Sequence, residues 1–356
     1  MAGVALCVAY LSYSEDLFMF ATKRVFFKLA GVAAAMAFSA AAFATDINGA
    51  GSTFAYPSYS KWAEAYKAAT GNLVNYQGIG SGGGMKQIKA KTVDFAGTDA
   101  PMTEAELAEN HLVQFPSEVG GVVIDVNLPG IKDNQLKLDG ATAADIFRGA
   151  ITKWNDPRIA KLNHGVKLPN LAITVVHRSD GSGTTFVFSN YLATQSEAFK
   201  KDVGAGTIVN WPSNSLGGKG NPGVAANVKK ISGAIGYNDY PDAKANNLTL
   251  VMMKNADGKF VTATQPAMAD AAANADYKSK TMAPSLLNMP GAKTWPIVTA
   301  TYVLAPEQAD AAKQKAVKDF FTWSLNHGQK MAEDLGYVAL PSSVVKLVEA
   351  RMKEMK

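Results

Sequence analysis

The chain has 356 residues, of which 47% are hydrophobic and 18% are charged, and its formal net charge is +5. This length is enough for two domains with buried cores, because domains of about 100–200 residues are usual. The positive charge is spread along the chain without blocks of Lys and Arg, so we expect no nucleic-acid binding. The single cysteine, Cys7, excludes a disulfide and a cysteine metal site.

Residues 1–44 carry the signature of an export signal rather than of a folded domain. A short basic region at 23–28 precedes an apolar run at 29–38, and Ala42-Phe43-Ala44 supplies a small-x-small cleavage motif. The apolar run is too short and too rich in alanine to span a membrane. We therefore expect a cleavable signal peptide, a mature chain that begins at Thr45 without a lipid, and a released, soluble protein.

The first mature residues predict a strand, a glycine turn and a helix. The strand covers 46–49, and the helix covers 57–70, where aromatic residues recur at i, i+3 and i+7. Gly71 stands where this helix would end. In the turn between the two elements, the hydroxyl of Thr53 is either a helix cap or a donor to an anion.

A second strand, at 73–77, is followed by the glycine-rich run 78–84 and a helix at 85–90. The glycines match the G-x-G-x-x-G pattern of dinucleotide-binding proteins. However, no clear strand that ends in an acidic residue follows about 20 positions later, as that fold requires. The same glycines let the backbone approach a small oxyanion, with Ser81 donating its hydroxyl.

A third strand, at 93–98, leads into a turn that contains Asp99, and a helix begins at 102. Ligand groups of α/β proteins often lie at the carboxyl ends of strands. Asp99 is therefore either a ligand group or a turn residue. The long apolar run at 120–127 predicts a buried strand that crosses into a second domain.

The second domain begins with predicted helices at 145–154 and 156–162, and its central feature is the polar turn 177–185. This turn follows a β-branched strand at 172–176 and precedes a helix at 185–192. Free backbone N–H groups at such a turn, together with the helix dipole, form a cradle for an anion.

Four polar side chains of this turn have complementary roles. Arg178, Ser182 and Thr184 add donors, whereas Asp180 adds a carboxylate where an anion is expected. The ligand should therefore carry a proton that a carboxylate can accept, as phosphate does and sulfate does not. The alternative is an ordinary turn in which Asp180 and Ser182 cap the helix.

The rest of the chain predicts a glycine loop at 216–223, a helix at 224–230, a strand at 295–304 that crosses back, and helices at 307–326 and 342–355. Lys219, in the glycine loop, is either a phosphate ligand or a solvated charge. The four histidines are scattered singly, so we expect no metal site. His177 is a base that is able to activate Ser182, but Gly181-Ser182-Gly183 does not match a G-x-S-x-G nucleophile elbow.

Several of these pieces, in this order, resemble the periplasmic phosphate-binding proteins of the bacterial phosphate ABC importer, the PstS family. The pieces that carry the resemblance are 49–54, 76–81, 94–99, 178–184, 217–220 and 233–237. The resemblance implies an α/β, two-lobed, type II periplasmic binding protein. It implies a ligand cleft between the lobes and a hinge of two crossing strands. The corresponding domains are residues 45–124 plus 299–356 for lobe I and residues 125–298 for lobe II.

The resemblance also implies a set of phosphate-binding residues in each lobe. Lobe I supplies Thr53, the backbone of Phe54, Ser81 and Asp99. Lobe II supplies Arg178, Asp180, Ser182, Gly183 and Thr184. Because Asp180 lies two residues from Arg178 on extended chain, we expect the two side chains to pair. That leaves Asp99 as the main acceptor of the phosphate proton.

The function implied by the resemblance is high-affinity binding of inorganic phosphate and its delivery to the membrane permease of an ABC importer. We expect a monomer without a cofactor and without enzymatic activity. The opening residues 46–49 are also similar to the related DING phosphate-binding proteins, around which phosphatase activity has been claimed. An exported phosphatase-like protein is therefore the alternative.

Overall fold

The computed structural model describes residues 45–273 and 275–356. The predicted signal peptide at 1–44 lies outside the described residues. The structure begins with three parallel strands that alternate with helices. The strands are β1 (Ile47–Gly51), β2 (Val74–Gly78) and β3 (Phe95–Thr98), and the helices are α2 (Tyr56–Thr70), α3 (Ser81–Lys89) and α4 (Glu104–Asn110). β1 pairs with both β2 and β3. Since parallel strands end at the same sheet edge, the segments after β1, β2 and β3 meet there.

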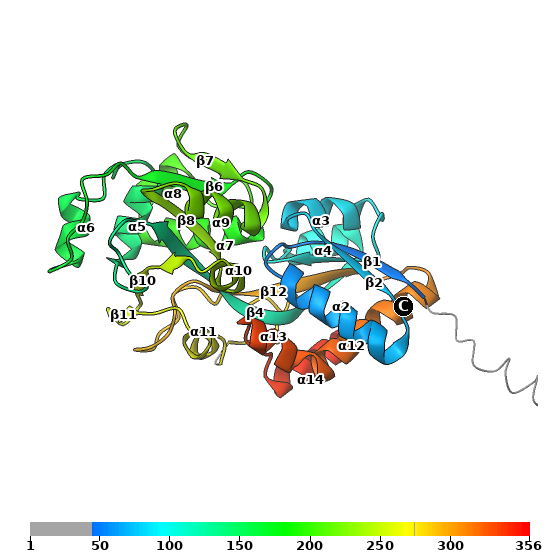
Figure 1. Cartoon of the computed structure of the whole chain (residues 1–356). Helices are drawn as coiled ribbons and strands as arrows, with labels where there is room; N and C mark the ends of the chain where they lie inside the picture. The colour runs from blue at the N-terminus through cyan, green and yellow to red at the C-terminus, as the bar shows by residue number, and fades with distance from the viewer. Residues whose placement is uncertain (1–44, 274) are drawn as a thin grey trace, which may run out of the picture. The chain divides into compact units, whose positions relative to one another are not determined.

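Two long antiparallel strands connect the two parts of the main sheet. β4 (Leu112–Asn127) pairs with β12 (Val298–Pro306) along its first half, and β12 also pairs with β3. From Val122 onward, β4 pairs instead with β8 (Ala234–Asp239). Figure 1 shows β4 and β12 running side by side through the middle of the sheet. These are the two strands that the sequence predicts to cross between domains.

The point at which β4 changes partner divides the described residues into two sides. We call residues 45–121 and 298–356 the β1 side, and residues 122–297 the β8 side. The predicted domain boundaries, at 124/125 and 298/299, lie within a few residues of this change. The division of the chain into two lobes that move against each other stays a prediction.

The β8 side repeats the alternation of strands and helices. Its strands in the main sheet are β6 (Thr174–Arg178), β7 (Leu216–Gly218), β8 and β9 (Thr249–Leu250). A small sheet holds β5 (Lys137–Leu138), β10 (Met252–Lys254) and β11 (Phe260–Val261). The helices are α5 (Gly140–Phe147), α6 (Pro157–Leu162), α7 (Gly183–Gln195), α8 (Glu197–Asp202), α9 (Gly220–Lys230), α10 (Tyr240–Ala245) and α11 (Gln265–Ala272). The order of the main sheet is β2-β1-β3-β12-β4-β8-β6-β7, with β9 beside β4.

Three C-terminal helices return to the β1 side. They are α12 (Ala311–His327), α13 (Gln329–Leu335) and α14 (Ser342–Met352). α12 and α13 pack on α2, and α14 packs on β4. The indole N–H of Trp62 donates to the carbonyl of Gly328 at 2.8 Å, which fixes α2 to the junction of α12 and α13.

Each side has its own aromatic core. On the β1 side, the ring of Phe95 packs edge-on against Phe321, and Tyr59 stacks on Trp62. On the β8 side, Phe188 stacks on Tyr237, with ring centroids 4.4 Å apart. All these side chains are fully buried. Burial of several rings, at about 1.5–3 kcal/mol for each large apolar side chain, holds the helices on the sheet and so fixes their N-termini.

The structure corrects several predicted helix boundaries. α3 begins at Ser81 instead of 85, and α9 begins at Gly220 instead of 224, so the glycines belong to the helices and not to loops. Gly80 has a φ of +87°, which lets the chain turn sharply into α3. α5 ends at Phe147, earlier than the predicted 154, and α13 was not predicted at all.

Candidate functional site

All nine residues that the sequence marks as site residues lie where the β1 side meets the β8 side. Each stands at or just after the carboxyl end of a parallel strand: β1, β2 and β3 on one side and β6, whose last residue is Arg178, on the other. An ideal Cβ atom placed on Gly183 would lie 2.5 Å from both the Ser81 hydroxyl and a carboxylate oxygen of Asp99. The backbone at the start of α7 therefore closely approaches Asp99, which follows β3, and Ser81, which begins α3.

Three helix N-termini point into this region. α3 begins at Ser81, α7 at Gly183 and α9 at Gly220. The first N–H groups of a helix have no partner within the helix, and the helix dipole adds about half a positive charge there. Such a group of N-termini attracts an anion without requiring many basic side chains.

Arg178 is the basic side chain at this place, and it is held from several directions. Its guanidinium donates to Asp180 through Nε (2.8 Å) and Nη2 (2.6 Å). Nη1 donates to the amide oxygen of Asn221 at 2.7 Å and to the hydroxyl of Thr184 at 3.3 Å. The side chain is only 1% exposed. The predicted pairing of Arg178 with Asp180 is confirmed.

Asp180 stays ionised in this pair. Partial burial acts to raise its pKa, but the hydrogen bonds and charge of Arg178, with the backbone N–H of Gly220 at 3.0 Å, outweigh it and lower the pKa of Asp180. Both carboxylate oxygens already accept from the guanidinium. Asp180 therefore neutralises much of the Arg178 charge and orients the planar group.

Asp99 has a different environment, because its carboxylate lies among hydroxyls. It is 1% exposed and accepts from Ser52 (2.9 Å to Oδ1, 2.7 Å to Oδ2), from Thr301 (2.7 Å to Oδ1) and from Ser81 (3.3 Å to Oδ2). Burial raises the pKa of Asp99, and the hydroxyls and the charge of Arg178 oppose that rise. The carboxylate thus faces Gly183 with no ion pair of its own.

The two sides are in direct contact around this centre. The backbone N–H of Gly82 donates to the carbonyl of Gly181 at 2.8 Å. The backbone N–H of Asn221 donates to the hydroxyl of Thr53 at 3.3 Å. A Cβ atom on Gly80 would lie 2.2 Å from a carboxylate oxygen of Asp180, so only glycine permits this approach. The glycine run at 78–84, which matches a dinucleotide-binding pattern, therefore allows the backbones of the two sides to come close together.

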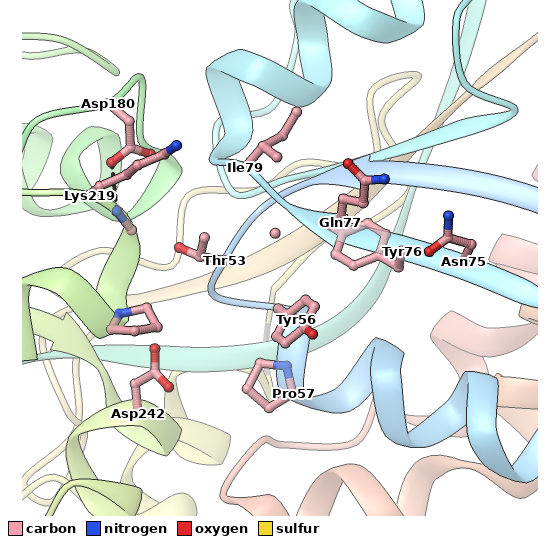
Figure 2. Close-up of a pocket in the computed structure, with 13 residues that line it drawn as sticks. Thr53, Tyr56, Pro57, Asn75, Tyr76, Gln77, Ile79, Asp180, Lys219 and Asp242 are labelled. Carbon is pink, nitrogen blue, oxygen red and sulfur yellow. Dashed lines mark hydrogen bonds between the residues drawn. The ribbon is translucent and has the colours of Figure 1, made fainter.

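A pocket of about 530 Å³ opens beside these contacts, with Thr53 and Asp180 in its wall. Figure 2 shows Thr53 between Asp180 and Lys219 on one side and Gln77 and Tyr76 on the other. The remaining predicted site residues do not line this pocket and are buried. Gly220, at the N-terminus of α9, does line it, so the pocket adjoins one of the three helix N-termini.

The alternative readings of three residues are resolved by their contacts. Ser182 does cap α7, since its hydroxyl accepts from the backbone N–H of Thr185 at 3.0 Å. Thr53 does not cap α2, the helix that follows it, because its hydroxyl accepts from the backbone N–H of Asn221 in the first turn of α9. The ring of His177 stacks on Trp211 and its Nδ1 contacts the carbonyl of Arg178, so these contacts direct it away from the role of a base for Ser182.

Sequence reasoning missed four residues that support the site. Ser52 and Thr301 donate to Asp99, whereas Asn221 and Tyr237 hold Arg178. The hydroxyl of Tyr237 accepts from the backbone N–H of Arg178 at 3.1 Å. Ser52 stood in a motif that carries the resemblance, but the pairing of β12 with β3 was needed to find Thr301.

Within residues 45–273 and 275–356, no group of three or more His, Cys, Asp or Glu side chains is placed to hold a metal ion. Among the same residues, no helix has both the length and the apolar character needed to cross a bilayer.

Comparisons with known proteins identify the family of this chain. A family model described as "PBP superfamily domain" matches residues 38–327. Phosphate-binding protein PstS of Pasteurella multocida is 50% identical over 312 residues, which cover 87% of this chain and 90% of that protein. Phosphate-binding protein PstS of Xylella fastidiosa (strain Temecula1) is 49% identical over 306 residues, covering 85% of this chain and 84% of that protein.

Among solved structures, a high affinity periplasmic phosphate-binding protein, PfluDING, bound with phosphate at pH 8.5, has a similar fold. Its TM-score is 0.70 at 21% identity, over 86% of this chain and 93% of that chain. The predicted α/β fold of a type II periplasmic binding protein is confirmed.

Proposed function

Because this chain belongs to the PstS family of phosphate-binding proteins, we propose that it binds inorganic phosphate between its two sides. One observation carries the proposal most directly. Three helix N-termini, one arginine and one buried carboxylate without an ion pair come together at Ser81, Asp99, Arg178, Gly183 and Gly220. Such a site offers many donors and one acceptor, which is the complement of an oxyanion that carries a proton.

The donors come from both sides. On the β1 side they are the hydroxyls of Thr53 and Ser81 and the backbone N–H of Phe54. On the β8 side they are the guanidinium of Arg178, the hydroxyls of Ser182 and Thr184, and the backbone N–H of Gly183. Hydrogen bonds to a charged acceptor are worth about 1.5–3 kcal/mol each, so several such donors hold a fully desolvated anion.

The two carboxylates have separate roles. Asp180 serves Arg178, whose charge it partly neutralises and whose plane it fixes. Asp99 has no such partner and accepts the proton of the phosphate. Sulfate carries no proton near neutral pH, so its oxygens would face the Asp99 carboxylate with lone pairs opposed, and the site rejects it.

The ligand enters when the two sides separate about β4 and β12, and it is enclosed when they close. The contacts that support a closed arrangement are Gly82 to Gly181 and Asn221 to Thr53. Within the described residues, β4 is the strand of the main sheet that pairs with both sides, so bending it near Val122, where its partner changes, alters few hydrogen bonds. The lobes are then residues 45–124 with 299–356 and residues 125–298.

We place this protein in the periplasm, where it delivers phosphate to the permease subunits of an ABC importer as a monomer. The signal peptide predicted at 1–44 supports export, and the binding-protein relatives support the delivery step. N-terminal sequencing of the exported protein tests the first part: the sequence should begin at Thr45, and Met1 or a lipid-modified terminus would contradict it.

An exported phosphatase is the alternative, and the described residues give it little support, because the contacts of His177 direct it away from Ser182. Equilibrium dialysis with radiolabelled phosphate, together with an assay of p-nitrophenyl phosphate hydrolysis, separates the two functions. We expect one phosphate bound per chain and no turnover. Turnover without stoichiometric binding would contradict the proposal.

A further inference from the structure

Thr301 lies on the crossing strand β12, far from Asp99 in sequence but opposite to it in the sheet. The register of β12 against β3 pairs Tyr302 with Thr98, which brings the preceding residue of β12 beside the residue that follows Thr98. The Thr301 hydroxyl lies 2.7 Å from Oδ1 of Asp99 and is fully buried.

A β-bulge fixes the orientation of Thr301. The register between β12 and β4 shifts at Thr301 and Tyr302, so that Ser117 of β4 has no direct partner. Ser117 donates its hydroxyl to the carbonyl of Thr301 at 3.2 Å and contacts the hydroxyl of Tyr59 at 2.7 Å. Bulges redirect side chains next to functional sites, and this one holds Thr301 toward Asp99.

The hydroxyl protons around Asp99 can be counted. Ser52 has one proton and lies within reach of both carboxylate oxygens, Thr301 reaches only Oδ1, and Ser81 lies at 3.3 Å from Oδ2. When Thr301 and Ser52 both donate to Oδ1, the Oδ2 atom keeps a free acceptor position. Oδ2 is the atom that faces the backbone of Gly183.

We propose that Thr301 is a positioning residue that determines ligand specificity: its hydroxyl saturates Oδ1 and keeps Asp99 an ionised acceptor whose Oδ2 receives the ligand proton. This proposal rests on the proposed phosphate binding and deepens it. Without the Thr301 hydroxyl, Oδ1 keeps only the longer contact to Ser52, at 2.9 Å, and the buried carboxylate loses one of its donors.

The charges around Asp99 make the Thr301 hydroxyl important for keeping this carboxyl ionised. Burial raises the pKa of Asp99, and Ser52, Thr301, Arg178 and Ser81 oppose the rise. The charge of Asp99 in turn contributes to raising the pKa values of Glu118 on β4 and Asp239 on β8, and of four phenols, those of Tyr59, Tyr76, Tyr302 and Tyr337. Arg178 is thus the one cation among the groups that act on Asp99. Loss of the Thr301 hydroxyl should raise the pKa of Asp99 further, so that the acid protonates at a higher pH.

The test compares phosphate and sulfate binding by three variants of the mature chain. Thr301→Val removes the hydroxyl at nearly constant shape, and Thr301→Ser keeps a hydroxyl. Thr299→Val makes the same chemical change two residues earlier on β12, where the hydroxyl donates to the carbonyl of Ala300 and not to Asp99. Calorimetry with each anion gives the ratio of the two affinities, measured from about pH 5.5 to about pH 8.5.

For Thr301→Val, we expect phosphate to bind about tenfold more weakly and the phosphate-to-sulfate preference to fall by about tenfold or more. As the pH is lowered, the phosphate-to-sulfate preference should disappear at a higher pH in Thr301→Val than in the unchanged protein. The reason is that the preference requires an ionised Asp99, which exists only above the pKa of this carboxyl. Phosphate has the same protonation equilibrium in both experiments, so the difference between the profiles reports on the protein. Thr301→Ser should restore both properties, and Thr299→Val should leave them unchanged.

An unchanged preference and pH profile in folded Thr301→Val would overturn the inference, as would an equal change in Thr299→Val. If Thr301→Val does not fold, Thr301→Ala and Ser52→Ala replace it in the same comparison, and an unchanged preference in both again overturns the inference. Failure of the unchanged protein to bind phosphate would instead refute the proposed function, so the two failures are distinguishable.

Discussion

The backbone N–H of Asn221 donates to the hydroxyl of Thr53 at 3.3 Å, although 168 residues separate the two in sequence. Asn221 stands in the first turn of α9 on the β8 side, and Thr53 follows β1 on the β1 side. The same asparagine accepts from Arg178 through its side-chain oxygen and donates through its amide nitrogen to Asp239. Asn221 therefore contacts the β1 side through its backbone and orients Arg178 through its side chain.

Replacing Asn221 by Ala tests whether the Asn221 side chain orients Arg178 for phosphate binding. The backbone N–H remains, so contact with Thr53 is kept, whereas Nη1 of Arg178 loses the closer of its two acceptors and keeps only the hydroxyl of Thr184. We expect phosphate affinity to fall about tenfold, as for a lost hydrogen bond to a charged group, with the phosphate-to-sulfate preference unchanged. Calorimetry with both anions measures this. Asn227→Ala, on the same helix but bonded to Gly217, is the control and should bind like the unchanged protein.

Replacing Gly183 by Ala should block the site without unfolding the protein. The added Cβ would stand 2.5 Å from Ser81 and Asp99, so the two sides cannot approach as closely. Overpacking of this size costs about 1–3 kcal/mol, or about a tenfold to hundredfold loss of phosphate affinity. Gly206→Ala, where the new atom meets only a carbonyl at 3.4 Å, is the matched control. Equal affinity in the two variants would show that Gly183 lies outside the site.

The two carboxylates should respond differently to amide substitution. In the unchanged protein, the Asp99 carboxylate offers only acceptors to the ligand. Asp99→Asn replaces one of them with an N–H donor, so phosphate should bind more weakly and sulfate should be penalised less. Asp180→Asn chiefly disturbs Arg178, which affects both anions. The phosphate-to-sulfate preference should therefore fall more in Asp99→Asn. Titrations of both variants with both anions decide this, and a larger fall in Asp180→Asn would reverse the assigned roles.

A separate prediction concerns stability, because Asp125 is fully buried and its only side-chain partner is the amide of Asn238 at 2.7 Å. Burial raises the pKa of Asp125 to about 7, so the folded state holds a proton that the unfolded state releases at lower pH. Its contribution to stability is therefore lost as the pH rises through about 7. Between about pH 5.5 and about pH 8.5 the free energy of unfolding should fall by about 2 kcal/mol from this group alone.

Asp125→Asn, which is neutral at every pH, should remove that part of the fall. Urea unfolding of both proteins at the two pH values, without ligand, measures it. An equally steep fall in Asp125→Asn would assign the pH dependence to other groups.

The strands that carry the site could be predicted from sequence, since β1, β2, β3, β6 and β8 are short segments that contain apolar residues and are bounded by glycine or polar turns. Local composition specified these elements, and the family resemblance of the motifs around them implied the nine predicted site residues. The pairing of Arg178 with Asp180 was also predictable, because only two residues of extended chain separate them.

What composition could not specify were contacts between distant segments. Thr301 is one threonine of a β-branched strand, and only the antiparallel register of β12 against β3 brings it to Asp99. The start of α3 was placed too late because glycines weaken a helix in isolation. In the fold they are required, since the start of α3 must approach the backbone of Gly181.

Calorimetry of residues 45–356 with phosphate and with sulfate, in the same buffer, tests whether Asp99 selects phosphate. We predict one phosphate per chain and a sulfate affinity lower by about 10⁴-fold or more, because the Asp99 carboxylate accepts a proton that only phosphate offers. Comparable affinities for the two anions, or no binding of phosphate, would contradict it.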